Sequence, residues 1–386
     1  MFRASNRPHN IQIPFSGAAG DRKWMIGVFR AACLCLLFLV APAARAASPE
    51  LVIEDNDYLG PVGSDLQSAL ILLASPSVKI LGFTVVTGDA WRDEESEFLL
   101  RFLEIAGAAD MPVYKGAVFP LVNGKARMTA WEAAYGKIPW KGAFNDPNFG
   151  PGGFHPNDPY AIMPNPAGAP KIRAHTESAV GFMIRMVHEH PHEVTIVEGG
   201  PMTNLALAIR QDPEFAALAK QLVFMGGIID GNMAQIADDA DFFSDFNMLF
   251  DPEAAHIALT ADWAKITCLG SVTMKTRIDQ ALIDRVAAVG TPVSKLIAKY
   301  VEKFPLWDEL AAAVVVDPSV ATRSIDGYMD VEIEHGMHYG LVHVWPEALR
   351  PHMGERKVTI VTDVDSDKLR DMFVKATGFN GVRRGE

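Results

Sequence analysis

Residues 51–70 read LVIEDNDYLGPVGSDLQSAL, and this stretch decides the fold. Its first three residues form the short apolar run typical of a buried parallel strand, and Asp55, Asn56 and Asp57 follow where that strand should end. A Gly-Pro turn then leads to Ser64, the expected N-cap of a helix with an apolar face. In open α/β sheets, ligands bind beyond the carboxyl ends of the strands, so a binding site is expected at this point.

Three carboxylates gather around this strand end. Asp55, Asp57 and Asp65 would repel one another unless a cation or a proton lay between them. Ligands that are all oxygen favour a hard cation such as calcium or magnesium. The alternative is that Asp55 and Asp57 only cap a solvated turn.

The first 46 residues have the layout of a secretory signal peptide. Arg22, Lys23 and Arg30 precede an apolar run over residues 31–40, and Ala44-Arg45-Ala46 is a small-x-small pattern that predicts cleavage after Ala46. The protein is therefore expected to be secreted or periplasmic. An uncleaved anchor is the alternative, although the run is short for a bilayer and no later segment resembles a membrane helix.

The expected mature chain is strongly acidic. Residues 1–46 hold six basic residues and one acidic residue, and the rest of the chain holds 29 basic and 46 acidic residues, a net charge of −17. This charge argues against binding to a nucleic-acid backbone. Cys268 is the one cysteine after residue 46, so no intrachain disulfide is expected in the mature chain.

A strand, a turn and a helix follow one another repeatedly along residues 47–386. This order predicts a single α/β domain with a mostly parallel central sheet and helices on both faces. After the first strand, further strands are expected at 78–87, 112–114, 194–197, 222–225, 264–269, 330–334, 340–345 and 357–362. Residues 116–171 lack periodicity and are rich in Pro, Gly and aromatic residues, so they are expected to form a long active-site loop.

Several segments together resemble the inosine–uridine-preferring nucleoside hydrolase family. The resemblance covers about residues 51–378 and includes Asp55-Asn56-Asp57, Ser64-Asp65, GGPMTNLALAIRQDPEF (199–215), LVFMGG (222–227), SDFNMLFDPEAA (244–255) and WDELAAAVVVDP (307–318). It implies the Rossmann-like nucleoside hydrolase fold, a tightly held Ca2+ ion, and hydrolysis of the N-glycosidic bond of ribonucleosides to a free base and ribose. It also implies a homodimer or homotetramer.

The resemblance implies a role for each matching residue. Asp57 would bind calcium and take a proton from the attacking water, and further calcium ligands would be Asp65, Asp308 and the carbonyl of Gly199. Departure of the base builds positive charge on the sugar, so a site of this kind needs a base, a nucleophile and carboxylates. The residues matching the positions that grip the ribose are Asp89, Asn232, Asp245 and Asn247, although Asn232 also suits a plain turn at 230–232.

Two positions depart from the family pattern. Ser64 stands where many relatives have an aspartate assigned to the ribose 2-hydroxyl, and it could supply only a weaker contact. Trp307 stands where many have a histidine that protonates the leaving base. This resembles the purine-preferring branch, in which tryptophans stack on the base. Trp131 or Trp140 would form the other side of the stack or would anchor the long loop, and His155 is an alternative proton donor.

Two other functions can be weighed against a calcium-dependent, purine-leaning hydrolase. A non-catalytic nucleoside- or ribose-binding protein would keep the calcium and the pocket, and Ser64 together with the missing histidine permits it. A phosphatase with an aspartyl nucleophile would need Asp55-x-Asp57 but has no use for the GGPMTN and WDEL segments.

Overall fold

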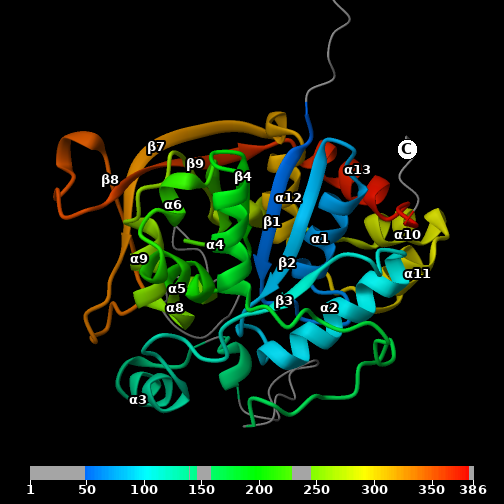
Figure 1. The fold of residues 1–386 in the computed structure, drawn as a ribbon, viewed down its shortest axis with the longest axis horizontal. Coiled ribbons are helices and arrows are strands. Elements are labelled where there is room, and N and C mark those ends of the chain that lie inside the picture. The colour runs from blue at the N-terminus through cyan, green and yellow to red at the C-terminus, as the bar shows by residue number, and fades with distance from the viewer. Residues whose placement is uncertain (1–47, 139, 146–157, 228–244, 382–386) are drawn as a thin grey trace, which may run out of the picture. The chain divides into compact units, whose positions relative to one another are not determined.

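The computed structural model describes residues 48–138, 140–145, 158–227 and 245–381. The expected signal peptide, His155 and Asn232 lie outside these residues. One nine-stranded sheet runs through the domain in the order β3-β2-β1-β4-β5-β6-β9-β7-β8 (Figure 1). Its strands are β1 (Glu50–Asn56), β2 (Val78–Val85), β3 (Val113–Lys115), β4 (Val194–Glu198), β5 (Gln221–Met225), β6 (Ile266–Leu269), β7 (Ala321–Val331), β8 (Val342–Trp345) and β9 (Arg356–Val364).

The sheet is mostly parallel, as the sequence predicts. β1 pairs in parallel with β2 and with β4, and Asp55 lies opposite Thr84 on one side and Glu198 on the other. The loops that follow these three strands therefore leave the sheet at the same edge. The exception lies at one end of the sheet, where β7 pairs antiparallel with both β8 and β9.

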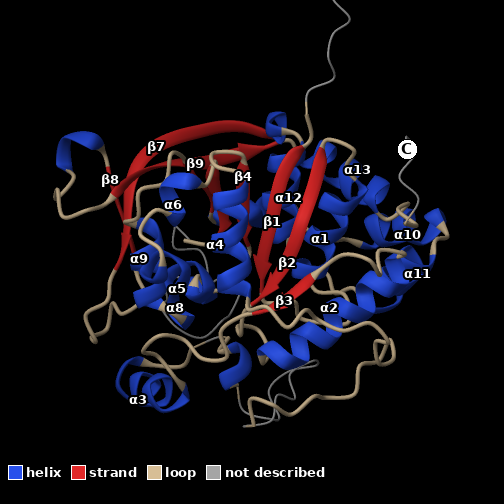
Figure 2. Ribbon diagram, viewed as in Figure 1, coloured by secondary structure: helices blue, strands red, loops and turns tan. Residues whose placement is uncertain are grey.

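Helices cover both faces of the sheet (Figure 2). One apolar core joins the sheet to α1 (Ser64–Ala74), α2 (Arg92–Ala106), α10 (Gln280–Val289), α11 (Pro292–Tyr300), α12 (Asp308–Val316) and α13 (Ser366–Ala376). A second core, on the other face, joins it to α4 (Ala179–Glu189), α5 (Thr203–Gln211), α6 (Phe215–Leu218), α8 (Phe246–Phe250) and α9 (Pro252–Leu259). The layered α/β architecture follows because the helices of these two cores bury apolar residues against the sheet.

Two segments differ from the sequence predictions. The expected loop over residues 116–171 contains a helix, α3 (Lys125–Tyr135), which buries only Met128 and Glu132 and so shows no apolar stripe in the sequence. β7 begins at Ala321, nine residues before the predicted strand. The prediction missed this part because none of the first six residues of β7 is buried and most of them are polar. Hydrophobic periodicity identifies buried strands and misses such an exposed one.

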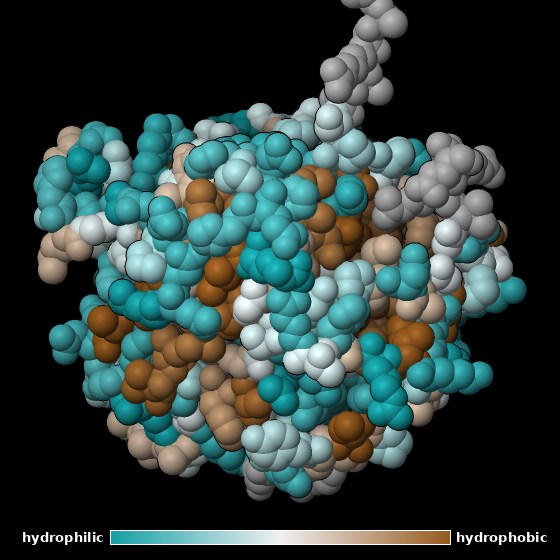
Figure 3. Space-filling model, viewed as in Figure 1, coloured by the Kyte–Doolittle hydropathy of each residue, from teal (hydrophilic) through white to brown (hydrophobic). Residues whose placement is uncertain are grey.

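The outer surface is mixed in character. On the face shown in Figure 3, hydrophobic residues form separate patches between hydrophilic ones. Across the described part of the chain, no helix is both long enough and apolar enough to span a membrane.

Candidate active site

The first part of the candidate site comes from the ends of β1 and β2. Asp57 directly follows β1, and Asp89 follows β2. The main-chain N–H of Asp89 donates a hydrogen bond to Asp57 Oδ2 at 2.9 Å. A Cβ atom on Gly88 would lie 2.0 Å from the same oxygen, so only glycine leaves room for the Asp57 carboxylate in this position.

The second part comes from two helix N-termini. Asp65 lies in the first turn of α1 and Asp308 is the first residue of α12, and their carboxyl groups lie beside each other. The main-chain N–H of Leu59 also donates to Asp65 Oδ2 at 3.0 Å. The N-terminal ends of helices carry partial positive charge, which favours carboxylates here.

The carboxylates of Asp57, Asp65 and Asp308 are buried and lie close enough to interact electrostatically. Asp57, Asp65 and Asp308 are 2%, 5% and 1% exposed. Burial, followed by repulsion from Asp89 and Asp65, raises the pKa of Asp57 well above its usual range. Burial also raises the pKa of Asp65 strongly and that of Asp308 to about 8. The carboxylates therefore need either protons or a counter-charge, as the sequence predicts.

The carboxylate oxygens of Asp57, Asp65 and Asp308 are of the kind that binds hard cations, but they are not arranged around a single point. Among the described residues, no group of three or more His, Cys, Asp and Glu side chains is arranged to hold a metal ion. The carboxyl groups of Asp65 and Asp308 lie beside each other, and burial followed by repulsion from Asp308 raises the pKa of Asp65. Asp308 Oδ1 is nevertheless buried without a hydrogen-bond partner in the described structure. A set of ligands that are all oxygen, with one buried oxygen unpaired, fits calcium or magnesium.

The predicted carbonyl ligand and two predicted ribose ligands lie at the same sheet edge. Asn247, in α8, donates from Nδ2 to the carbonyl of Gly199 at 2.6 Å. A carbonyl oxygen has a second lone pair, so this bond leaves Gly199 able to bind a cation as well. Asp245 caps α8 by accepting from the N–H of Met248 at 2.9 Å, while its Oδ2 is buried without a partner in the described residues. Burial raises the pKa of Asp245 to about 7.

The tryptophans fall into different places. The indole N–H of Trp140 donates to Asp89 Oδ1, which brings this part of the long loop to the candidate site. The indole N–H of Trp131 donates to the carbonyl of Gly336 at 3.0 Å, and its ring packs near Tyr135. These contacts favour the anchoring role for Trp131 over base stacking.

Trp307 already has an aromatic neighbour that the sequence analysis missed. The ring of Phe304 stacks on Trp307 with centroids 5.4 Å apart and planes inclined by 27°. The indole N–H of Trp307 also donates to Met274 Sδ at 3.3 Å. Phe304 is 47% exposed, and only its place three residues before Trp307 could have pointed to it.

Further buried carboxylates surround the site, and sequence reasoning missed them too. Glu95 is fully buried, accepts from the N–H of Ala90 at 2.6 Å and contributes to the raised pKa of Asp57. In the sequence it lies in an acidic first turn of α2, which is typical of a solvated helix start. Glu309 is also fully buried and lies within the WDEL segment beside Asp308.

Ser64 differs from its predicted role. α1 begins at Ser64 itself, and Gly63 precedes the helix, so Ser64 does not cap α1. Its hydroxyl instead reaches Asp308 and Glu309 of α12. A contact between two segments 244 positions apart carries no local sequence signal.

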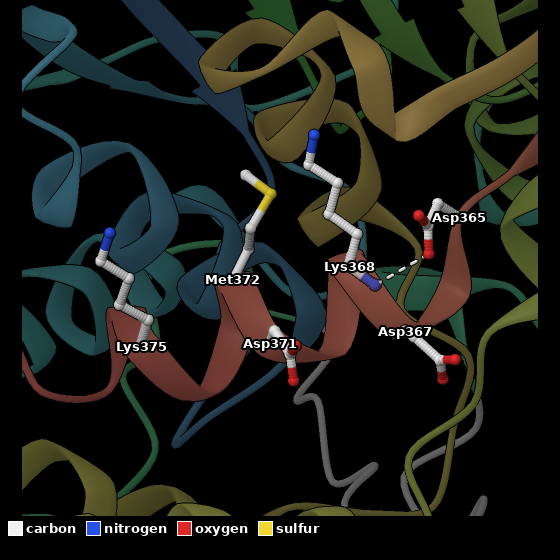
Figure 4. A pocket seen from close by; sticks show the side chains of 6 residues that line it. All are labelled: Asp365, Asp367, Lys368, Asp371, Met372 and Lys375. Carbon is white, nitrogen blue, oxygen red and sulfur yellow. Dashed lines mark hydrogen bonds between the residues drawn. The ribbon is translucent and has the colours of Figure 1, made fainter.

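An open surface hollow lies elsewhere, along α13 (Figure 4). Its lining contains none of the predicted site residues and consists of Asp365, Asp367, Lys368, Asp371, Met372 and Lys375. We therefore assign the candidate site to the sheet edge, where the buried carboxylates meet.

Comparisons with known proteins identify the family of the chain. The sequence profile of the family described as inosine-uridine preferring nucleoside hydrolase matches residues 52–371. An uncharacterised protein of Schizosaccharomyces pombe is 32% identical over 350 residues, which cover 85% of this chain and 84% of that protein. The pyrimidine-specific ribonucleoside hydrolase RihA of Salmonella arizonae is 26% identical over 336 residues, covering 83% of this chain and 97% of RihA.

A solved structure shows the same fold. The purine-preferring ribonucleoside hydrolase from Gardnerella vaginalis superimposes with a TM-score of 0.65 at 22% identity, covering 86% of this chain and 100% of that one. The matched region includes every predicted site residue from Asp57 to Asp308, since all of them fall within residues 52–371.

Proposed function

The chain belongs to the inosine-uridine preferring nucleoside hydrolase family, enzymes that hydrolyse ribonucleosides, and we propose that its own reaction is calcium-dependent and favours purine nucleosides. The products are the free base and ribose. The observation that carries this proposal is the meeting of Asp57, Asp65 and Asp308 from opposite ends of the chain, buried and electrostatically coupled at one sheet edge.

The side chains at this edge can share the chemical work. Asp57, Asp65, Asp308 and the Gly199 carbonyl would hold a calcium ion, which supplies positive charge that lowers the pKa of a water molecule. Asp57 takes the proton from the attacking water. Asp89, Asp245 and Asn247 present oxygen and amide groups for the ribose hydroxyls, and the buried carboxylates complement the positive charge that develops on the sugar. Asn232, which lies outside the described residues, stays a predicted ribose ligand.

The purine preference rests on Trp307. An indole face stacks on a large purine ring system and attracts the cationic character of a base that is gaining a proton. Phe304 supports the indole from one side. Trp140 lies at the edge of the site through its bond to Asp89. The names of the relatives do not decide this point, because one is pyrimidine-specific and another purine-preferring.

Chelation followed by an activity assay tests the proposal. The purified protein is treated with a chelator, and release of reducing sugar is measured from inosine, guanosine and uridine before and after calcium is restored. We expect release to stop on chelation, to return with calcium, and to be fastest with the purine nucleosides. Calcium-independent release, or no release from any of the three, would contradict the catalytic proposal.

Binding without release would support the alternative, a nucleoside- or ribose-binding protein. The Asp57→Asn variant separates the two cases. For an enzyme the variant keeps nucleoside binding and loses about 10²- to 10⁴-fold in kcat. For a binding protein there is no turnover to lose, and binding changes little beyond any loss of metal.

We also propose that the protein is secreted or periplasmic and assembles as a homodimer or homotetramer. The first part is supported by the predicted cleavage after Ala46. Amino-terminal sequencing of the protein from its native host tests it, and a chain that still begins at Met1 would contradict it. The second part is supported by the family resemblance alone, and light scattering of the purified protein tests it.

A further inference from the structure

Ser64 connects the start of α1 to the start of α12. Its hydroxyl accepts a hydrogen bond from the main-chain N–H of Asp308 at 2.9 Å and donates one to Glu309 Oε2 at 2.6 Å. Trp307, the residue just before α12, has no side-chain oxygen with which to cap that helix. Ser64 thus performs for α12 the capping that a serine normally performs for its own helix.

The next residue of α1 reinforces the connection. The carboxyl group of Asp65 lies beside that of Asp308, and α1 and α12 pack against each other. Two consecutive residues of α1 therefore hold two consecutive residues of α12. Asp308 is the first residue of α12, so the position of its carboxylate depends on these contacts between the starts of α1 and α12.

Glu309 makes the hydroxyl of Ser64 hard to replace. Its carboxyl group is fully buried, and its Oε1 atom has no hydrogen-bond partner in the described structure. Loss of the bond from Ser64 would leave a second buried oxygen of Glu309 unpaired, which is unfavourable. A hydroxyl has a single proton, and that of Ser64 is already donated to Glu309.

We propose that Ser64 is a positioning residue, which fixes the first turn of α12 and so holds Asp308 against Asp65, and that it does not bind the sugar of the substrate. The inference rests on the proposed function in that Asp308 serves the reaction as a calcium ligand. It gives Ser64 a structural role beside the proposed calcium ligands Asp65 and Asp308, and no role in binding the ribose.

Exchange of the Asp308 amide proton tests the joint without any metal or substrate. In the Ser64→Ala variant this N–H loses its acceptor, and we expect its hydrogen exchange to quicken by at least about tenfold. Ser64→Thr keeps the hydroxyl and should restore slow exchange. Thr291→Val is the matched control, because Thr291 likewise accepts from a helix N–H, that of Ser294 at 3.0 Å, and donates to another element, the Thr377 carbonyl at 2.6 Å.

Calcium affinity and sugar preference complete the test. We expect Ser64→Ala to weaken calcium binding by about 10- to 100-fold, as is usual when a group supporting a metal ligand is lost, and Thr291→Val to leave it unchanged. Activity of Ser64→Ala should fall by the same factor with inosine and with 2′-deoxyinosine.

Three results would overturn the inference. These are unchanged exchange at Asp308, unchanged calcium affinity, or a loss of activity confined to inosine, which would mean that Ser64 contacts the 2′-hydroxyl. A wild-type protein that binds no calcium and releases no base would contradict the proposed function instead. In that case the exchange experiment would still decide whether Ser64 fixes α12.

Discussion

At the scale of single residues, the site depends on close approach between backbone and carboxylate. Gly88 follows β2 and faces Asp57, and a Cβ atom there would lie 2.0 Å from Asp57 Oδ2. Non-bonded heavy atoms essentially never lie within 3.0 Å of a Cβ atom, so any larger residue at position 88 must displace the carboxylate. Gly88 is therefore as much a part of the site as the acidic residues.

The Gly88→Ala variant should separate this effect from general stability. Displacement of the proposed base by about 1 Å should lower kcat by about 10²-fold. Gly124→Ala is the control, because a Cβ atom on Gly124 meets no heavy atom within 4 Å. Both variants are assayed for sugar release from inosine, and circular dichroism checks the fold. A Gly88→Ala enzyme with a kcat within about threefold of wild type would show that Asp57 is not held as described.

Trp307 should decide how strongly purines are preferred. Removing the indole in Trp307→Ala should lower kcat/KM for inosine about tenfold more than for uridine, because the larger ring loses more stacking. The control is Trp345→Ala, which removes a tryptophan from β8, where its neighbour is His343. Equal losses of kcat/KM with inosine and uridine would mean that Trp307 does not distinguish purine from pyrimidine bases.

At the scale of elements, helix starts and strand ends meet at one edge. α1, α8 and α12 each bring a carboxylate in or just before their first turn, and β1, β2 and β4 end at the same place. The partial positive charges of three helix N-termini thus offset part of the repulsion among buried carboxylates. The rest of the repulsion is left for protons or a bound cation to offset.

A second junction between elements gives a prediction for pH. His256 of α9 lies 2.7 Å from Asp330 of β7, and this hydrogen bond raises the pKa of His256 above its usual value, against smaller opposing effects of burial and Arg210. The stabilisation is complete below about pH 6.5, the pKa of an unfolded histidine, and is lost as pH rises through the raised folded value.

Urea unfolding at pH 6 and pH 9 measures this contribution. Wild type should exceed His256→Gln in free energy of unfolding by about 1 kcal/mol at pH 6, and the difference should largely vanish at pH 9. Lys275, whose amine lies 2.7 Å from Asp363, offers a control ion pair without a histidine, and Lys275→Gln should show the same difference at both pH values. A constant difference for His256→Gln would contradict the assignment.

At the scale of the whole molecule, the sequence predicts the sheet and the acidic edge because both leave local patterns. Buried parallel strands are apolar runs. Asp57 and Gly199 each follow one directly, and Asp89 lies four residues after the end of β2. It does not predict α3 or the exposed first half of β7, which lack a buried stripe. Nor does it reveal the bonds of Ser64 to α12, since these depend on how distant segments pack.

The sequence also does not predict that Glu95 and Glu309 are buried. Glu95 and Glu309 resemble ordinary acidic residues at helix starts, where solvent usually surrounds them. Their complete burial follows from the convergence of several elements on one edge. Local sequence patterns therefore place the candidate site at the sheet edge but do not reveal the other buried side chains that pack around it.

Calorimetric titration with calcium tests the central claim most directly, that carboxylates from both ends of the chain gather around one cation. The measurement compares wild type with Asp65→Asn and Asp308→Asn at constant ionic strength. The predicted result is one calcium ion bound per wild-type chain, with affinity lowered by more than about tenfold in each variant. A wild-type protein that binds no calcium, or variants that bind it as tightly as wild type, would contradict the account.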